Sequence, residues 1–267
     1  MNRAEQALYE LKQTDELAAM DSPVHRFSAL SKLLVTLAYL ITVMSFGRYD
    51  LPGVFMMAVY PYFIFQLSGL SFRMCLHKMR WVIPLVAFIG IFNPFFDREI
   101  LLKLGPLAVS GGVISFITLL IKGILCLSAS FLLVSTTRID DLCGAMRKLH
   151  VPTLLVTVFL LTYRYVSVLV EEVAVMSDAY HLRAPGQKGI AFNAWGSFLG
   201  QLLLRSMDRA KELYSATLLR GYNGDFPLSR KSESGTGSYI YLSVWIAVFT
   251  LLRTVNLPAL IGSLFVG

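Results

Sequence analysis

Two arginine residues are the strongest candidates for a binding role in this sequence. Each stands at the expected end of a long polar helix, beside a small residue. They stand in Leu182-Arg183-Ala184 and Leu219-Arg220-Gly221. Arginine presents its N–H donors in a rigid fork that matches carboxylates, and a small neighbour lets another backbone approach. For either end alone, helix capping explains the pattern, because a cation complements the helix dipole and glycine commonly follows a helix. Since the pattern recurs, we interpret both ends as docking surfaces for an acidic groove on a partner.

Other residues that could do chemistry are scattered along the chain: His25, His77, His150, His181, Cys75, Cys126 and Cys143. No histidine has another metal-ligating residue at ligand spacing, so we expect no metal site. Glu171 and Glu172 are adjacent and point to different helix faces, which makes them a poor acid–base pair. The sequence has no Walker-type glycine-rich loop. We therefore expect no enzyme activity, no ATP hydrolysis and no cofactor on this chain.

The composition is typical of a membrane protein with basic parts outside the lipid. Of the 267 residues, 55% are hydrophobic and 15% are charged, and the mean hydropathy is +0.62. An ordinary soluble domain has about 25% charged residues. The chain nevertheless carries 24 Lys and Arg against 17 Asp and Glu, a net charge of +7. These values exclude a disordered chain and disfavour a soluble enzyme or nucleic-acid binder, so we expect an integral membrane protein.

Six apolar segments approach the length that a bilayer requires, which is roughly 17 to 25 residues for a helix. They are 30–46, 51–70, 81–96, 107–135, 153–170 and 238–256. Prolines occur inside the second and third segments. A helix bundle tolerates them where neighbouring helices satisfy the freed carbonyl groups.

The positions of lysine and arginine predict the orientation, since cytoplasmic loops are enriched in both residues. The stretch from Arg138 to Lys231 contains 12 of the 24 cations and is therefore expected in the cytoplasm. Residues 1–24 are polar and have no signal-peptide core, so the N-terminus is also expected in the cytoplasm. We predict a multi-pass protein of the plasma membrane.

The segment 153–170 lies between two basic stretches, and a single crossing would put one of them outside the cell. We predict that it lies along the inner edge of the membrane or packs under the bundle and a partner, with a sixth span as the alternative. The expected fold is all-α, with about five transmembrane helices and a cytoplasmic insert. Its parts are an N-terminal segment, four spans, the insert and a last span with the C-terminus: 1–24, 25–137, 138–237 and 238–267.

Three helices are expected in the insert, at 138–150, 153–183 and 197–220. The first and third have apolar residues on one face and charged residues on the other. The second is apolar first and polar later, as expected for a helix that leaves an apolar environment for water. The second and third end at Arg183 and Arg220.

Lys122 is the one ionisable residue deep inside a predicted span. A charge at the bilayer centre costs roughly 2.5–3.5 kcal/mol on insertion scales, so it needs a partner. No Asp or Glu lies within the predicted spans. That leaves backbone carbonyls, hydroxyls such as those of Ser115 and Thr118, or water. A structural role is favoured over a role in transport.

Several residues stand in motifs that resemble those of the transmembrane T components of energy-coupling factor (ECF) transporters, in particular the cobalt-type T proteins, CbiQ. The resemblance covers most of the chain beyond about residue 20. Its most specific parts are Leu161-Thr162-Tyr163-Arg164-Tyr165 with Leu169 and Glu171-Glu172, then Leu204-Arg205-Ser206, Arg209-Ala210 and Leu219-Arg220-Gly221-Tyr222.

This resemblance implies the T-component fold and assigns roles to the two arginine motifs. In the family, two Ala-Arg-Gly-like motifs end crossed cytoplasmic coupling helices, which seat in grooves of two ATP-binding-cassette subunits. Arg183 and Arg220 would be the motif arginines. Gly221 matches the family glycine, whereas Ala184 replaces it in the first motif. Leucine stands at 182 and 219, where alanine is common.

The implied function is that of a coupling subunit in an importer. It would transmit ATP-driven motion of two ATPase subunits to a substrate-binding membrane subunit, most simply for cobalt uptake. ATP and Mg would be held by the ATPase subunits, and metal capture would belong to the substrate-binding subunit. Alternatives are a T component for nickel, one shared among vitamin-binding subunits, a membrane-embedded enzyme, or a scaffold without transport. The other expected partner is membrane lipid, and no nucleic acid is expected.

Overall fold

The structure is a computed structural model that describes residues 3–92, 100–104, 107–187, 189–222 and 235–254. The chain forms two compact units, both built from segments far apart in the sequence. The insert unit comprises residues 1–17 and 139–231, and the bundle unit comprises residues 18–138 and 232–267.

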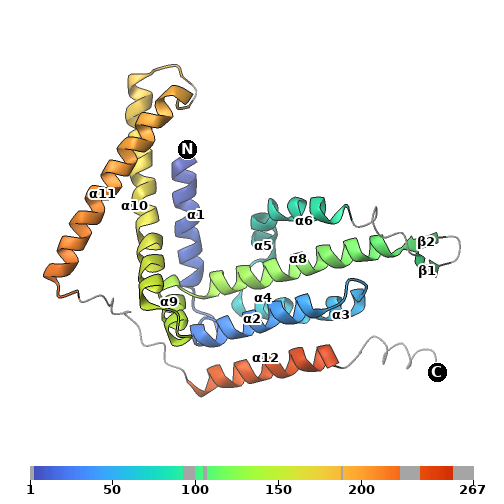
Figure 1. Cartoon of the computed structure of the whole chain (residues 1–267). Coiled ribbons are helices and arrows are strands. Elements are labelled where there is room, and N and C mark those ends of the chain that lie inside the picture. Colours follow the sequence, from blue (N-terminus) through green and yellow to red (C-terminus); the bar gives the residue numbers. More distant parts are fainter. Residues whose placement is uncertain (1–2, 93–99, 105–106, 188, 223–234, 255–267) are drawn as a thin grey trace. The chain divides into compact units, whose positions relative to one another are not determined.

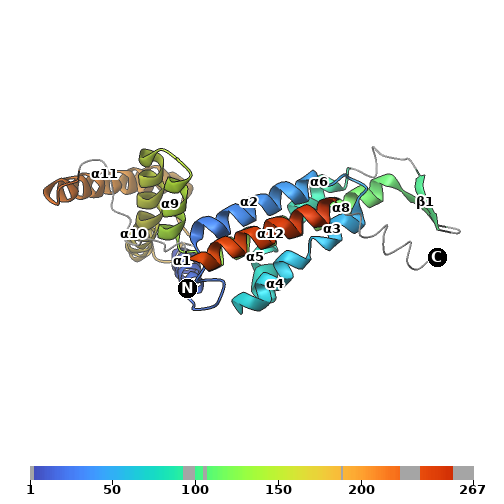
Figure 2. The same cartoon turned by 90° about the horizontal axis from the view of Figure 1, so that it is seen from below.

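The bundle unit is helical apart from one short hairpin in its described residues (Figure 1). Its elements are α2 (Ala29–Ser45), α3 (Leu51–Met56), α4 (Val59–Ser68), α5 (Phe72–Met79), α6 (Val82–Gly90), β1 (Ile100–Leu104), β2 (Leu107–Ser110), α8 (Gly111–Thr136) and α12 (Thr236–Thr254). The long helix α8 contacts α2, α3, α4, α5 and α6, and α12 packs along α2. Both views show α2 and α12 side by side (Figures 1 and 2).

An aromatic cluster joins α2, α4 and α12 in the core of the bundle. The ring of Tyr39 lies 4.6 Å from that of Tyr60 and 5.4 Å from that of Phe249, and Trp245 lies 4.8 Å from Tyr60. Tyr39 and Phe249 are almost completely buried. Rings at these distances contribute about 0.5–1.5 kcal/mol per pair beyond the area they bury.

The break between α3 and α4 follows from a proline. Pro61 has no N–H to donate, and its ring conflicts with the carbonyl of Met57, four residues earlier. The hydroxyl of the buried Tyr39 donates to this carbonyl at 3.0 Å. The neighbouring helix therefore satisfies the group that the proline frees, as expected for a proline inside a bundle.

The insert unit contains α1 (Arg3–Ala18), α9 (Ile139–Lys148), α10 (Thr153–Arg183), a 3₁₀ turn at Phe192–Ala194, and α11 (Trp195–Leu219). The helix α10 runs for 31 residues without a break. Its N-terminal part packs on α9 around a small core of Cys143, Val156 and Leu160. Its C-terminal part lies beside α11.

The helical membrane fold is confirmed, but two predicted spans are wrong in detail. Residues 107–110, placed in a span, form β2, which pairs antiparallel with β1. The Gly105-Pro106 dipeptide before them is a turn signal that outweighs their apolarity. The predicted span 81–96 begins as α6, which has only nine residues, and residues 93–96 lie outside the described part of the chain.

Four helical segments are long and apolar enough to cross a membrane: Leu51–Ser68, Gly111–Thr136, Thr153–Arg183 and Thr236–Thr254. The helix α2 is apolar and, with 17 residues, slightly shorter. Length and composition thus agree with the predicted spans at 30–46, 51–70 and 238–256. They do not test whether α10 crosses the bilayer or lies at its edge.

Candidate functional site

The first arginine motif forms an exposed tip at the end of α10. The side chain of Leu182 is 84% exposed, and Arg183 beside it is also exposed. Ala184 ends the helix with φ −126°, and its N–H donates to the carbonyl of Tyr180 at 3.0 Å. Gly186 follows with φ +90°, in the left-handed region that favours glycine. The chain therefore leaves the helix directly after the motif.

A tyrosine holds the loop that follows this tip. The hydroxyl of Tyr180 donates to the side-chain carbonyl of Gln187 at 2.9 Å. The same hydroxyl accepts the N–H of Ala191 at 3.2 Å. One side chain of α10 thus ties down both halves of the turn toward α11.

The second motif forms the exposed end of α11 and has a different backbone geometry. Gly221 has φ +80°, and its N–H donates to the carbonyl of Leu218 at 3.0 Å. The N–H of Tyr222 donates to the carbonyl of Thr217, also at 3.0 Å. This pair of bonds is a Schellman motif, which satisfies the last carbonyls of the helix. Leu219, in the last turn, is 91% exposed.

The two motifs lie at opposite ends of one helix pair. The helices α10 and α11 run antiparallel, so Arg183 is near the turn that joins them and Arg220 is at the far end (Figure 1). The 25 residues of α11 correspond to a length of roughly 37 Å. Both guanidinium groups are exposed, and neither has an ion pair within the described residues. The structure therefore presents two separate arginine-bearing tips.

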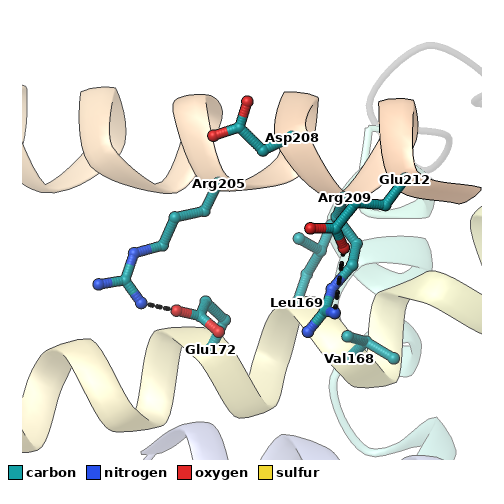
Figure 3. A pocket seen from close by; sticks show the side chains of 7 residues that line it. All are labelled: Val168, Leu169, Glu172, Arg205, Asp208, Arg209 and Glu212. Atoms are coloured by element: carbon teal, nitrogen blue, oxygen red, sulfur yellow. Dashed lines mark hydrogen bonds and ion pairs between the residues drawn. The ribbon is translucent and has the colours of Figure 1, made fainter.

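A charged cleft of about 320 Å³ lies between α10 and α11. It is lined by Val168, Leu169, Glu172, Arg205, Asp208, Arg209 and Glu212 (Figure 3). Arg205 of α11 forms an ion pair with Glu172 of α10, whereas Arg209 pairs with Glu212 within α11 at 3.6 Å. Exposed ion pairs contribute only about 0–1 kcal/mol each. Polar contacts of this kind hold the two helices together weakly.

Glu171 and Glu172 lie on different faces of α10, as their adjacency predicts. Glu172 is half-buried against α11, whereas Glu171 is exposed. Several residues of the quoted motifs thus line the α10–α11 cleft instead of the tips.

Two further contacts hold the N-terminal half of α10 to α9 and α1. Neither contact was predicted from the sequence. Arg164 donates to both carboxylate oxygens of Asp140 in α9, at 3.0 and 3.1 Å. The hydroxyl of Tyr163 donates to Asp15 of α1 at 2.5 Å. Polar residues inside an otherwise apolar helix signal such contacts, but the sequence alone does not identify Asp15 as a partner across 148 positions.

The small core beneath these contacts contains a buried cysteine. Cys143 is fully buried, and burial raises the pKa of its thiol. A buried, protonated thiol is unreactive.

The apolar face of α11 is largely uncovered. Leu199, Leu203, Met207, Tyr214 and Leu218 are each about half exposed or more, and Phe198 is the buried residue of this helix. Contiguous exposed apolar residues of this size mark surfaces that bind a protein or a membrane. The sequence predicts an amphipathic helix here, and its apolar face is available to a partner.

In the bundle unit, the partner of Lys122 is a backbone carbonyl, one of the kinds of partner expected from the sequence. Its ammonium group donates to the backbone carbonyl of Phe46, at the end of α2, at 2.6 Å. Arg253 of α12 reaches the same helix end, donating to the carbonyl of Ser45 at 3.1 Å and lying 4.8 Å from the Phe46 ring. The sequence pattern did not predict this role of Arg253. The feature of the sequence that could have pointed to Arg253 is a cation near the end of the last apolar helix.

No group of three or more histidine, cysteine or acidic side chains that could hold a metal ion occurs among the described residues. His25, for example, is engaged by the hydroxyl of Ser22 at 2.7 Å and the carbonyl of Ser135 at 3.3 Å.

Comparison with known proteins bears on these features. The family model of CbiQ, cobalt transport protein, matches residues 20–231. The nickel permease LarQ of Lactiplantibacillus plantarum is 30% identical over 116 residues, which are 43% of this chain and 42% of that protein. The cobalt transport protein CbiQ of Rhodobacter capsulatus is 34% identical over 96 residues, 35% of this chain and 38% of that protein. In these two comparisons the chain spans about two fifths of the relative's length.

A longer similarity extends over most of the molecule. The ECF transporter transmembrane protein EcfT of Lactococcus lactis is 25% identical over 219 residues. That alignment covers 76% of this chain and 82% of the relative.

Proposed function

The chain belongs to the CbiQ family of cobalt transport proteins, and from this membership we propose that it is the coupling subunit of an ECF-type importer. As such it hydrolyses no ATP itself. It transmits the motion of two ATPase subunits to a substrate-binding membrane subunit, and ATP and Mg are bound by the ATPases. The similarity to EcfT over three quarters of the chain supports this assignment.

The observation that carries the proposal is the presence of two arginine-bearing tips at opposite ends of one helix pair. A dimer of ATPases offers two equivalent grooves some distance apart, and the roughly 37 Å length of α11 separates the tips. Each tip exposes an arginine beside a leucine that is more than four-fifths exposed. An acidic groove with an apolar floor would bind both side chains.

The weak contact between α10 and α11 supports a mechanical role for the pair. Its cleft is charged, and its partly solvated ion pair between Arg205 and Glu172 contributes little to stability. When ATP rearranges the two ATPases, the seated tips move with the grooves that hold them, and α11 turns against α10 at small energetic cost. The N-terminal half of α10, held by Asp140 and Asp15, transmits this motion to the substrate-binding subunit.

The substrate is a transition-metal ion in this proposal, with cobalt as the first choice and nickel as the alternative. The family model and the Rhodobacter capsulatus relative are named for cobalt, whereas LarQ is named for nickel. Metal capture is assigned to the substrate-binding subunit. Metal uptake by cells that express this chain with its partner subunits, measured separately for cobalt and nickel, decides between the two ions.

Charge reversal at the tips tests the docking proposal. Arg183→Glu and Arg220→Glu would repel an acidic groove, so we expect each to reduce co-purification of the ATPase subunits and metal uptake at least tenfold, a loss typical of a desolvated charge pair. The matched control is Lys148→Glu, which reverses an exposed cation in the last turn of α9 and has the same cost against the helix dipole.

The outcomes separate the candidate functions. Unchanged ATPase recruitment and uptake in both tip variants, or an equal loss in Lys148→Glu, would contradict the docking role. If the intact chain recruits a cytoplasmic partner but no ATPase and supports no uptake, the scaffold alternative is correct.

A further inference from the structure

A groove of about 500 Å³ lies in the bundle unit where α5 turns into α6. It is lined by Arg73, Leu76, His77, Arg80, Ile83 and Pro84. Figure 1 shows the two helices meeting at a corner. The proposed coupling role uses none of these residues.

The helix α5 presents a mixed basic and apolar stripe away from the bundle. Leu76 and His77 lie three and four residues after Arg73, Arg80 lies four and three residues after them, and all four are exposed. Such spacing places them on a single helix face. On the opposite face Cys75 and Met79 are buried, so their packing fixes which way the basic stripe points.

The described residues that line the groove give it a positive charge. Within the part of the chain that the structure describes, no carboxylate pairs with Arg73 or Arg80. The sequence itself contains no Asp or Glu between Asp50 and Asp97. A ligand for this groove therefore carries negative charge.

The apolar surroundings of the groove are those expected where lipid headgroups begin. Trp81 is 81% exposed, and the guanidinium of Arg80 lies 5.7 Å from its ring. Exposed tryptophan is typical of the membrane–water interface. Beyond it Leu85, Phe88 and Ile89 of α6 are each at least 60% exposed, which suits contact with acyl chains. The groove thus has a basic end at α5 and an apolar end at α6.

We propose that this groove binds one anionic phospholipid. Arg73 and Arg80 hold the headgroup phosphate with charge-assisted hydrogen bonds, and the imidazole of His77 adds a further contact. An acyl chain lies along Leu76, Ile83 and Pro84. Basic pockets beside transmembrane helices bind anionic headgroups by this chemistry. The bound lipid stabilises the corner between α5 and α6, whichever substrate the transporter carries.

Lipid retention by the full-length protein tests the proposal. The purified chain in detergent receives equal amounts of phosphatidylglycerol and phosphatidylcholine, and native mass spectrometry counts the lipids that remain bound. We expect one phosphatidylglycerol in preference to phosphatidylcholine. Arg73→Gln and Arg80→Gln should each weaken its retention about fivefold, and the double variant should weaken it about 25-fold.

Two controls keep the result specific. Arg26→Gln with Arg48→Gln removes the same charge from the bundle unit outside the groove and should retain the lipid as the wild type does. Inorganic phosphate at millimolar concentration should not displace the lipid, because the acyl contacts contribute to binding. Circular dichroism shows that each variant keeps its helical content.

Equal retention of both lipids, or an equal loss in the control pair, would overturn the proposal. Displacement by inorganic phosphate would also overturn it, because it would indicate a simple phosphate site. A groove that is covered by a co-purified membrane subunit and retains no lipid would assign the surface to a protein partner.

Discussion

Basic side chains meet helix ends in both units of this protein, but with opposite results. In the bundle, Lys122 and Arg253 come from other helices and donate to the last carbonyls of α2. In the insert, Arg183 and Arg220 belong to the helix ends themselves and form no ion pair within the described residues. The bundle thus uses its cations to hold its own helices together, whereas the insert leaves them available to another molecule.

The two insert tips also differ from each other, although their sequences are alike. Gly221 closes α11 with a left-handed residue and two backbone hydrogen bonds. Ala184 closes α10 with a negative φ of −126°, and the side chain of Tyr180 orders the loop that follows. Backbone geometry therefore defines the second tip, and a side chain defines the first.

The largest expected effect on stability is at the end of α2. Lys122→Met leaves the buried carbonyl of Phe46 without its donor, so we expect a loss of about 1–3 kcal/mol in the free energy of unfolding. Thermal unfolding in detergent measures it, and Lys122→Arg should recover part of the loss. ATPase recruitment per folded molecule should stay unchanged. A higher melting temperature in Lys122→Met would contradict the account.

A smaller effect is expected at the end of α11. Gly221→Val places a β-branched residue at φ +80°, which costs about 1–2 kcal/mol and favours fraying of the last turn. We expect a roughly tenfold loss of ATPase co-purification with little change in global stability. The matched variant Ala184→Val lies at a negative φ of −126°, where valine meets no left-handed penalty, and should bind more nearly as the wild type does. Equal losses in both variants would remove the distinction between the tips.

The smallest effect is expected in the loop after α10. Tyr180→Phe removes the hydroxyl that joins Gln187 and Ala191, at a cost of about 0.5–1.5 kcal/mol. Hydrogen–deuterium exchange should quicken in residues 185–191 and stay unchanged at the end of α11. Equal exchange rates of residues 185–191 in the wild type and the variant would show that the tyrosine does not order this loop.

Sequence reasoning went furthest where one local pattern decides the outcome. Apolar length gave the helices of the bundle, and the glycine after Arg220 indicated the end of α11 within a residue. It failed at residues 107–110, where apolar residues form a strand, because apolarity alone does not separate a strand from a helix.

Contacts between distant parts of the chain could not be predicted from the sequence. The bond from Tyr163 to Asp15 joins residues 148 positions apart, and Arg253 reaches α2 across 208 positions. A single sequence specifies which side chains need partners, as it did for Lys122. The partner itself depends on how the helices pack.

The central claim is that the tips of α10 and α11 seat in the ATPase subunits, and cysteine cross-linking tests it most directly. Leu182→Cys and Leu219→Cys place thiols at positions 84% and 91% exposed, whereas the native Cys75 and Cys143 are buried. In the assembled complex we expect each new thiol, once labelled with a maleimide that carries a photoreactive group, to cross-link to an ATPase subunit on illumination, and Lys148→Cys to remain unlinked. Cross-links from neither tip, with ATPase subunits present in the complex, would contradict the account.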